Sequence, residues 1–342
     1  MAFLRVAGIM EKQTVNERLV EPKCFCGFHQ NDETLRHSAS GGLATALAEE
    51  TISQGGVVYG VIHAAAFDGA EYARVLEQKD LKSIQGTKYV DVNPICQGKN
   101  VYEMVLSDLR EGRIVLFTGL PCMVGAVVKR AEKEALSKNL IAVDLVCHGP
   151  TAPVVAKEYA ALMQKKHRSE VVDIQVRHKK NGEWIPPYLK VVYANGTSSM
   201  KPFTATEYAF AFRVLAPKRC YKCGFKGEKH LSDLTIGDYW GVDKKEDGYN
   251  NQGVSVAIAH TTRGIQVLEG LKNFRSFEIS YKKAIKGNPY YEKTRTEDSR
   301  HQRFEELLRT KGLKAACNRC MTPKEKLRQY IPQFLINLLH RL

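Results

Sequence analysis

Residues 114–150 read IVLFTGLPCMVGAVVKRAEKEALSKNLIAVDLVCHGP, and this stretch decides the fold. A hydrophobic run at 114–119 has the composition of a buried strand and leads within three residues to Cys122. A second such run at 140–146 leads directly to Cys147. Two successive strand–cysteine–helix units predict neighbouring parallel strands in an α/β sheet, with both thiols at the carboxyl edge, where ligands of such sheets bind.

Helical patterns follow both cysteines. Pro121 suits the first helical position, ahead of the pattern at 123–136. Thr151 is expected to cap a helix at 152–166. Cys122 would then lie near the positive end of a helix dipole. That setting lowers a thiol pKa and favours the thiolate that metal ligation and nucleophilic attack both require.

A CxxC pair lies further along the chain, in RCYKCGFKGEKHLSDLTIGDYWG at 219–241. The spacing lets Cys220 and Cys223 face one metal centre from a single turn. One CxxC cannot supply four ligands, so it needs two more thiolates, and Cys122 and Cys147 are the best candidates. This stretch alone leaves an iron–sulfur cluster, a structural zinc site and ordinary buried thiols open.

Small residues in SASGG, at 38–42, precede a helical pattern at 43–54. Ser40 is expected to cap this helix, while Gly41 and Gly42 let a ligand approach its first free N–H groups. A helix N-terminus fronted by small residues is a ready anion site. An ordinary capped helix is the alternative interpretation.

A buried strand is expected at 57–63, and the segment GTKYV at 86–90 lies beyond it. Lys88 has the charge to pair with a phosphate, and Tyr89 has the ring to stack on a flat cofactor. On pattern alone, both residues fit an exposed surface equally well.

The pattern changes after the two cysteine units. Asn-Gly turn signals between alternating segments predict an antiparallel, β-rich insertion at 171–200. The expected fold is therefore α/β: a mixed sheet with strand–cysteine–helix units, this insertion, and a helical C-terminal tail. We expect a core at 1–241 that contains the insertion, and a C-terminal α/β extension at 242–342.

The C-terminal tail has apolar spacing that predicts an amphipathic helix at 322–342. Thr322 and Glu325 would form its capping box, and Pro332 would kink it. Packing on the protein's own core is the expected role of this helix. Docking on a membrane surface or on a partner is the alternative.

Nine cysteines, an odd number irregularly spread, argue against a disulfide framework and favour a reducing cytoplasm. Cys24 and Cys26, in a loop-like stretch, are interpreted as spare thiols. Cys317 and Cys320 form a second CxxC without obvious partners. The N-terminus does not resemble a signal peptide, and the absence of an apolar run of about 18 residues predicts no spanning helix.

The chain has 342 residues and a net charge of +14. Such a balance suits nucleic acid, an anionic membrane, or acidic partners and substrates. The basic residues are spread out and no nucleic-acid motif occurs, so we expect no nucleic-acid binding. An acidic electron carrier or a phosphorylated cofactor remains a suitable partner for the positive charge.

Taken together, these motifs resemble one family, the coenzyme F420 hydrogenase/dehydrogenase beta-subunit family, which also contains the plant 7-hydroxymethyl chlorophyll a reductase. The resemblance covers roughly residues 24–241 in the family's order. The matching pieces are SASGG (38–42), GTKYV (86–90), VLFTGLPC (115–122), VDLVCHG (143–149), VRHKKNGEW (176–184), and RCYKC with SDLTIGDYWG (219–241).

The resemblance implies FAD and a 4Fe-4S cluster as cofactors. It implies an oxidoreductase that moves electrons between a two-electron organic partner, coenzyme F420 or another reduced substrate, and a one-electron carrier. By position, the cluster ligands would be Cys122, Cys147, Cys220 and Cys223, and the flavin-binding residues would be Ser38, Ser40, Gly41, Gly42, Lys88 and Tyr89.

Many family members carry an N-terminal ferredoxin module with CxxCxxC runs, and this sequence has no such run. We therefore expect a separate ferredoxin-like carrier as partner. The small-molecule substrate, the direction of electron flow and the oligomeric state, a homo-oligomer included, stay open.

Two further functions are compatible with the motifs. A non-catalytic scaffold would hold zinc in the four-cysteine site. A cysteine-nucleophile enzyme would use Cys147 beside His148, although adjacent residues rarely face each other productively.

Overall fold

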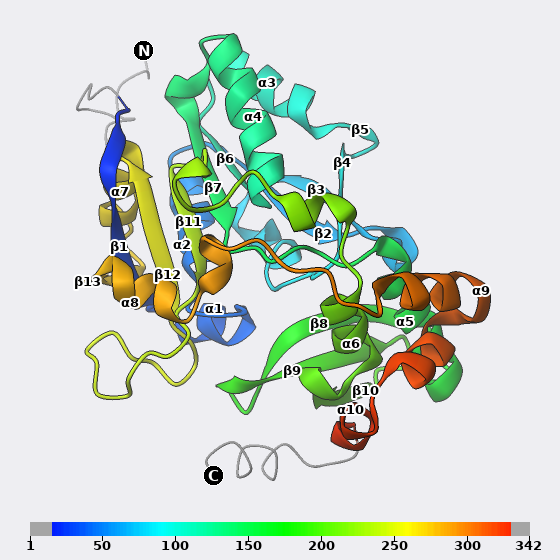
Figure 1. Cartoon of the computed structure of the whole chain (residues 1–342). Coiled ribbons are helices and arrows are strands. Elements are labelled where there is room, and N and C mark those ends of the chain that lie inside the picture. Colours follow the sequence, from blue (N-terminus) through cyan, green and yellow to red (C-terminus); the bar gives the residue numbers. More distant parts are fainter. Residues whose placement is uncertain (1–15, 330–342) are drawn as a thin grey trace.

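The computed structural model describes residues 16–329. Within them, ten strands form one mixed sheet in the order β13-β1-β12-β11-β7-β6-β2-β3-β4-β5, and β10-β9-β8 form a small antiparallel sheet (Figure 1). The strands are β1 (Arg18–His29), β2 (Val57–His63), β3 (Ala70–Val75), β4 (Val92–Cys96), β5 (Lys99–Asn100), β6 (Val115–Gly119), β7 (Leu140–Leu145), β8 (Val171–Lys180), β9 (Glu183–Tyr193), β10 (Ser198–Pro202), β11 (Leu234–Asp238), β12 (Ser255–Thr261) and β13 (Phe274–Ile279).

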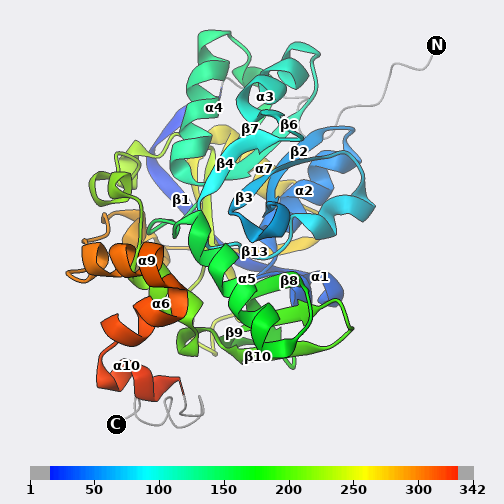
Figure 2. The same cartoon turned by 90° about the vertical axis from the view of Figure 1, so that its right-hand side faces the viewer.

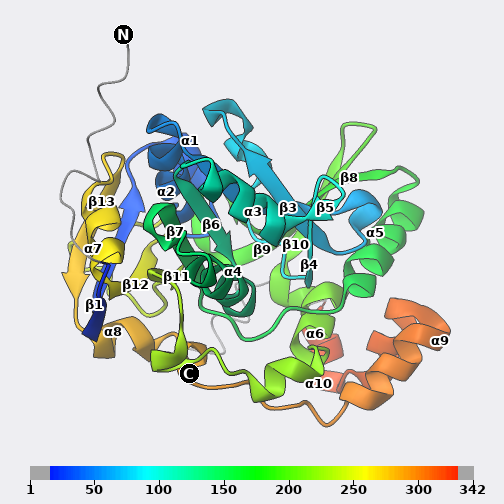
Figure 3. The ribbon, with the colours of Figure 1, turned by 90° about the horizontal axis from the view of Figure 1, so that it is seen from above.

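Helices cover both faces of the large sheet, with α2 and α7 on one face and α3 and α4 on the other (Figure 3). Strand β6 shows why: Val115 and Phe117 join the cluster under α3 and α4, whereas Leu116 joins the cluster under α2. Successive strand residues point to opposite faces, and here all three are apolar and fully buried. The helices are α1 (Asp32–His37), α2 (Leu43–Ser53), α3 (Val101–Arg110), α4 (Pro121–Lys133), α5 (Pro153–His167), α6 (Glu207–Val214), α7 (Thr262–Glu269), α8 (Tyr281–Lys286), α9 (His301–Cys320) and α10 (Pro323–Arg328).

The small sheet has a hydrophobic core of its own, which it shares with α5, α6 and α9 (Figure 2). Tyr208 and Phe304 are fully buried in it. Ala70 of β3 and Val90, which precedes β4, belong to the same cluster. The second lobe is therefore packed directly onto the end of the large sheet.

The expected α/β fold is confirmed. Strands β6 and β7 are parallel neighbours, with Gly119 opposite Asp144 at their carboxyl ends. The β-rich insertion is confirmed as the three antiparallel strands β8, β9 and β10. Beyond residue 241, β12 and β13 enter the large sheet on either side of β1. The division into a core and a C-terminal extension stays a prediction.

Two predicted helix caps are wrong. The N-cap of α2 is Gly42, whose positive φ of 81° suits glycine, and the Ser40 hydroxyl instead donates to the Val254 carbonyl at 2.8 Å. Helix α5 begins at Pro153 with Ala152 as its N-cap, without a side-chain cap. Proline fits the first helical position because its missing N–H would be unsatisfied there anyway.

The segment around Cys24 and Cys26 is also corrected. Both residues lie in β1, not in a loop, and both are buried. Strand β1 pairs with β12 on one side and β13 on the other, which satisfies its backbone at this point.

The capping box of Thr322 and Glu325 is confirmed at the start of α10. The rest of the predicted tail helix, with Pro332, lies outside the described residues. None of the helices between residues 16 and 329 has the length and apolar character needed to cross a bilayer.

Candidate functional site

Four cysteines gather at the carboxyl edge of the central parallel strands. Cys122 lies in the first turn of α4, directly after β6, and Cys147 follows β7. Cys220 and Cys223 lie in the loop that leads to β11. Electrostatic interaction links Cys122 with Cys147, Cys220 and Cys223, and links Cys220 with both of the others. As whole residues, all four are partly exposed, whereas the remaining five cysteines are buried.

Burial raises the pKa of three of these thiols, those of Cys122, Cys147 and Cys220. Burial raises the pKa of Cys147 to about 12, and the neighbouring Cys122 and Cys220 add to the rise. Burial also raises the pKa of Cys122 and of Cys220, against a lowering effect of Arg219. The prediction that the helix dipole lowers the pKa of Cys122 is therefore wrong, because desolvation outweighs it. Four thiolates here would need a bound cation to stabilise them.

Polar contacts fix the two cysteine loops against each other. Arg219 donates to both carboxylate oxygens of Asp91 at 2.6 Å. The Lys226 ammonium donates to the carbonyl of Cys147 and, at 2.5 Å, to that of Tyr290. A Cβ on Gly149, whose φ is +101°, would lie 3.2 Å from the Cys220 sulfur. Glycine is therefore required where the loops meet.

Four cysteine thiolates are the donor set that a 4Fe-4S cluster takes, and four cysteines lie at this edge. In the described part of the chain, no group of three or more His, Cys, Asp or Glu side chains is arranged to hold a single metal ion.

Tyr72 supports this fit. Its hydroxyl is buried and has no hydrogen-bond partner among residues 16–329. It lies close to Gly119, where a Cβ would be 2.4 Å away, and within electrostatic reach of Cys122. Leaving a hydroxyl buried without a partner costs about 1–3 kcal/mol, which a sulfur acceptor at this edge would offset.

A cavity of about 1180 Å³ lies beside the small sheet, between β8, α5, the end of α1 and residues 82–88. Burial lowers the pKa of Lys88 to about 8 and that of Lys179 to about 7. An anion in the cavity would favour their charged forms. Two carboxylates, Glu170 and Asp173, also line it. The cationic lining residues are Arg36, Lys82, Lys88, Lys157, Arg177 and Lys179.

Some of the predicted flavin-binding residues line this cavity and others do not. Ser38 and Lys88 line the cavity. The Ser38 hydroxyl donates to the Thr34 carbonyl at 2.8 Å, and the Lys88 ammonium donates to the Gln85 carbonyl at 2.7 Å. Ser40 does not line the cavity, but its carbonyl accepts a hydrogen bond of 2.7 Å from Lys179, which does.

Gly41 and Gly42 do not line the cavity either. A Cβ on Gly41 would lie 2.4 Å from both the Gly27 carbonyl oxygen and the Ser255 nitrogen. A Cβ on Gly42 would lie 2.9 Å from that of His29. The two glycines are therefore needed for close packing on β1 and β12, which is a structural role.

Tyr89 lies behind the cavity wall and begins a chain of ring contacts towards the cysteines. Its ring stacks on Phe212, with 4.4 Å between centroids and 8° between planes. Phe212 contacts His148 at 4.6 Å, and His148 adjoins Cys147. Lys88, the neighbour of Tyr89, lines the cavity. A continuous path of packed side chains thus joins the cavity wall to the cysteine edge.

Two residues at or next to this wall have strained backbone. Tyr89 has a φ of 39° and Arg177 a φ of 63°, both rare for residues other than glycine. Arg177 is buried, donates to the Tyr89 hydroxyl at 3.4 Å, and forms two hydrogen bonds of 2.9 Å with Asp238. Such strain costs of order 1–3 kcal/mol and persists where the surroundings over-determine the conformation, often at functional sites.

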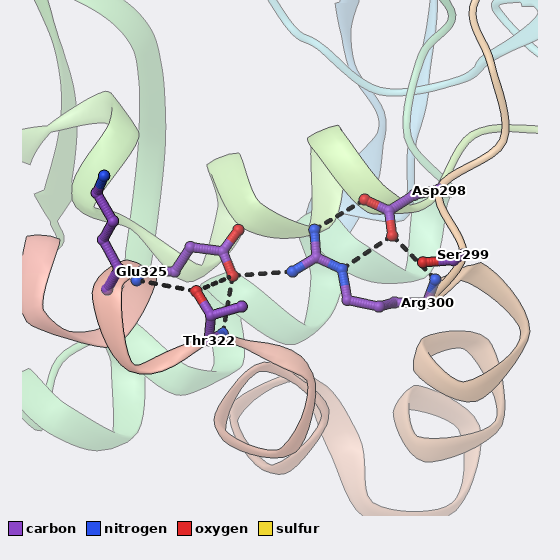
Figure 4. Close-up of a pocket in the computed structure, with 6 residues that line it drawn as sticks. Asp298, Ser299, Arg300, Thr322 and Glu325 are labelled. Carbon is purple, nitrogen blue, oxygen red and sulfur yellow. Dashed lines mark hydrogen bonds and ion pairs between the residues drawn. The ribbon is translucent and has the colours of Figure 1, made fainter.

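A second hollow, of about 610 Å³, lies between the start of α9 and α10 (Figure 4). Arg300 lies between two carboxylates and bonds to Asp298 and Glu325, each at 2.8 Å. Thr322 and Glu325 bond to each other as the helix cap. These charges are used to join the two helices, so the hollow is structural.

Sequence reasoning missed three residues at the site. Phe212 appeared as one apolar residue of a helix, and Tyr72 and Asp91 carried no motif. Phe212 and Tyr72 act through tertiary contacts, which no local spacing reveals. Asp91 directly follows GTKYV, and its charge beside that segment was an available signal.

Known proteins resemble this chain in sequence and in fold. The family model for the carboxy-terminal part of the coenzyme F420 hydrogenase/dehydrogenase beta subunit matches residues 112–284, just over half of the chain and all four site cysteines. A chain of the F420-reducing [NiFe] hydrogenase complex from Methanosarcina barkeri shares the fold, with a TM-score of 0.52 and 15% identity over 86% of this chain and 95% of that one. No curated protein matches. The chain therefore belongs to the coenzyme F420 hydrogenase/dehydrogenase beta-subunit family.

Proposed function

We propose that this chain is a flavin- and iron–sulfur-dependent oxidoreductase that exchanges electrons between a two-electron organic partner and a one-electron carrier such as ferredoxin. Its family consists of hydrogenase and dehydrogenase subunits, so redox chemistry follows from membership. One observation carries the finer proposal: the basic cavity and the four-thiol edge are joined by the packed rings of Tyr89, Phe212 and His148.

The cavity suits FAD. Its volume of about 1180 Å³ is larger than most ligand sites, roughly 300–1,000 Å³, and leaves room for a dinucleotide. A dinucleotide brings a pyrophosphate, and Lys88, Lys179 and Arg177 supply cations in a largely desolvated wall. The Arg177 Nε atom is buried and has no partner in the described residues, which leaves a donor for the cofactor.

The four thiols suit a 4Fe-4S cluster, held by Cys122, Cys147, Cys220 and Cys223. When bound, a flavin supplies two-electron chemistry with an organic molecule and a cluster supplies one-electron steps. In this proposal the protein's own residues would hold the two groups, and the packed rings of Tyr89, Phe212 and His148 would exclude water between them. The complex that contains the structural relative is F420-reducing, and an F420-like molecule is accordingly our proposed organic partner. A cytoplasmic location stays a prediction.

Cofactor analysis of the full-length chain, purified without oxygen, tests the proposal. We expect about four irons and four sulfides per chain, with extractable FAD. Stoichiometric zinc in a colourless protein would instead support the zinc scaffold. Reduced F420 and reduced nicotinamide, mixed rapidly with the protein, would show which organic donor bleaches the flavin absorbance.

A further inference from the structure

We propose that the loop carrying Cys220 and Cys223 is the docking surface for a small acidic one-electron carrier protein. The proposal deepens the function proposed above and depends on it. Over residues 217–230 the sequence has one carboxylate, Glu228, and five cations. These cations are Lys218, Arg219, Lys222, Lys226 and Lys229.

Most of this positive charge is not neutralised. Lys218, Lys222 and Lys229 are exposed, and the ion pairs found between residues 16 and 329 include none of them. Lys226 bonds to two backbone carbonyls, which carry no net charge. Arg219 alone is paired, with Asp91. The loop therefore presents a field that attracts anionic surfaces.

An apolar centre adjoins the basic loop. Tyr290 is 39% exposed, packs on His148 with 5.1 Å between ring centroids, and is joined to the loop through Lys226. Leu145, two residues before Cys147, is 37% exposed at the end of β7. An aromatic anchor surrounded by charged residues is typical of a protein interface.

Charge decides which partner this surface fits. A second copy of the chain also carries +14, so two such loops would repel each other. Carriers that exchange electrons bind through small, transient interfaces and are often guided by opposite charge. A carrier seated here would face the partly exposed thiols of Cys220 and Cys223, which shortens the path for the electron.

Binding measurements locate the surface independently of catalysis. The full-length, anaerobically purified protein would be titrated with an oxidised acidic ferredoxin carrying two 4Fe-4S clusters, in 50 mM and 300 mM salt. We expect the Kd to weaken at least about tenfold at the higher salt, because screening shortens the reach of surface charge. The variant Lys218→Glu/Lys222→Glu should weaken binding at least about tenfold at 50 mM salt.

A matched control is Lys133→Glu/Lys138→Glu. It changes the net charge equally, but Lys133 lies at the far end of α4, about 17 Å from Cys122 by helical rise, and Lys138 precedes β7. We expect this control to change Kd less than about twofold. The milder variant Lys218→Gln/Lys222→Gln should weaken binding by an intermediate factor, and unchanged iron content in each variant shows that folding is intact.

Three results would overturn the proposal: equal weakening by both double variants, binding of a DNA duplex as tight as that of ferredoxin, or sedimentation as a dimer that the loop variants disrupt. Absence of iron and flavin from the wild-type chain would instead refute the proposed function. The two failures are therefore distinguishable.

Discussion

The chain contains the CxxC spacing twice, and the two pairs have opposite surroundings. Cys220 and Cys223 lie in a basic loop, partly exposed and near two further thiols. Cys317 and Cys320 lie on α9, at 0% and 7% exposure, in the core of the second lobe. Cys317 donates its S–H to the Glu207 carbonyl. The same CxxC spacing therefore does not by itself identify a metal site; exposure and further thiols nearby distinguish the two pairs.

The largest expected effect separates the two pairs by metal content. Cys220→Ser should lose most of its iron, because one of four cluster ligands is gone. Cys317→Ser should keep wild-type iron and lose about 1–3 kcal/mol of unfolding free energy, because a hydroxyl replaces a buried thiol. Iron and sulfide analysis with urea unfolding measures both. Equal iron in the two variants would break the comparison.

Chemical reactivity sharpens the same contrast. In the iron-free protein, iodoacetamide should modify Cys223 at least about 100-fold faster than Cys317, because a buried thiol reacts only after local opening. Mass spectrometry of timed samples at pH 8.5 gives both rates. Comparable rates would mean that α9 opens readily, and burial would then not distinguish the reactivity of Cys317 from that of Cys223.

A smaller effect concerns the two serines of SASGG. Ser38→Asp would put a negative charge into the basic cavity and should weaken FAD binding about tenfold. Ser198→Asp, at an exposed position on β10, is the matched control and should leave binding unchanged. Ser40→Ala should lower stability by about 1 kcal/mol, through its lost bond to Val254, with FAD binding retained. Equilibrium dialysis measures FAD binding by each of these variants. A greater loss of FAD in Ser40→Ala would reverse the assignment.

The smallest effect is a pH dependence. Burial lowers the pKa of Lys179 from 10.5 to about 7, so between those values the unfolded chain binds more protons than the folded one. Stability contributed through this group therefore rises with pH across that window and is lowest below about pH 7. The variant Lys179→Met should lack this increase in stability with pH.

The free energy of unfolding of the wild type minus that of Lys179→Met should increase by about 1 kcal/mol from pH 8 to 9. Lys180→Met, at the exposed neighbouring position, is the control and should show no such growth. Unfolding in urea at each pH supplies the values. A constant difference between wild type and Lys179→Met would mean that Lys179 stays charged when folded.

The sequence predicted the strands that carry the site. The two apolar runs before Cys122 and Cys147 have the composition of strands buried on both faces, which a parallel sheet requires. Their adjacency followed from the short right-handed connection between them. The bounds of the helix expected at 43–54 and of the insertion expected at 171–200 also followed from local pattern, because turn residues lie near their ends.

The sequence could not predict which helix each polar residue caps or which distant group it contacts. Ser40 had the right type for an N-cap, but Val254, more than 200 residues away, accepts its hydroxyl. Likewise, the pKa of Cys122 is raised by burial under neighbouring segments, and the effect of burial outweighs that of the helix dipole. Tertiary contacts of this kind carry no local periodicity.

Strand β1 has a consequence for biosynthesis. Its two partners, β12 and β13, end at Thr261 and Ile279, roughly 250 residues after β1 itself. At about 5–20 residues per second, the ribosome needs on the order of ten seconds or more to supply them. Until then the amino-terminal segment waits with Cys24 and Cys26 uncovered, and premature termination before β12 would leave it without either neighbour. Closure of the large sheet therefore has to wait until β13 has been synthesised.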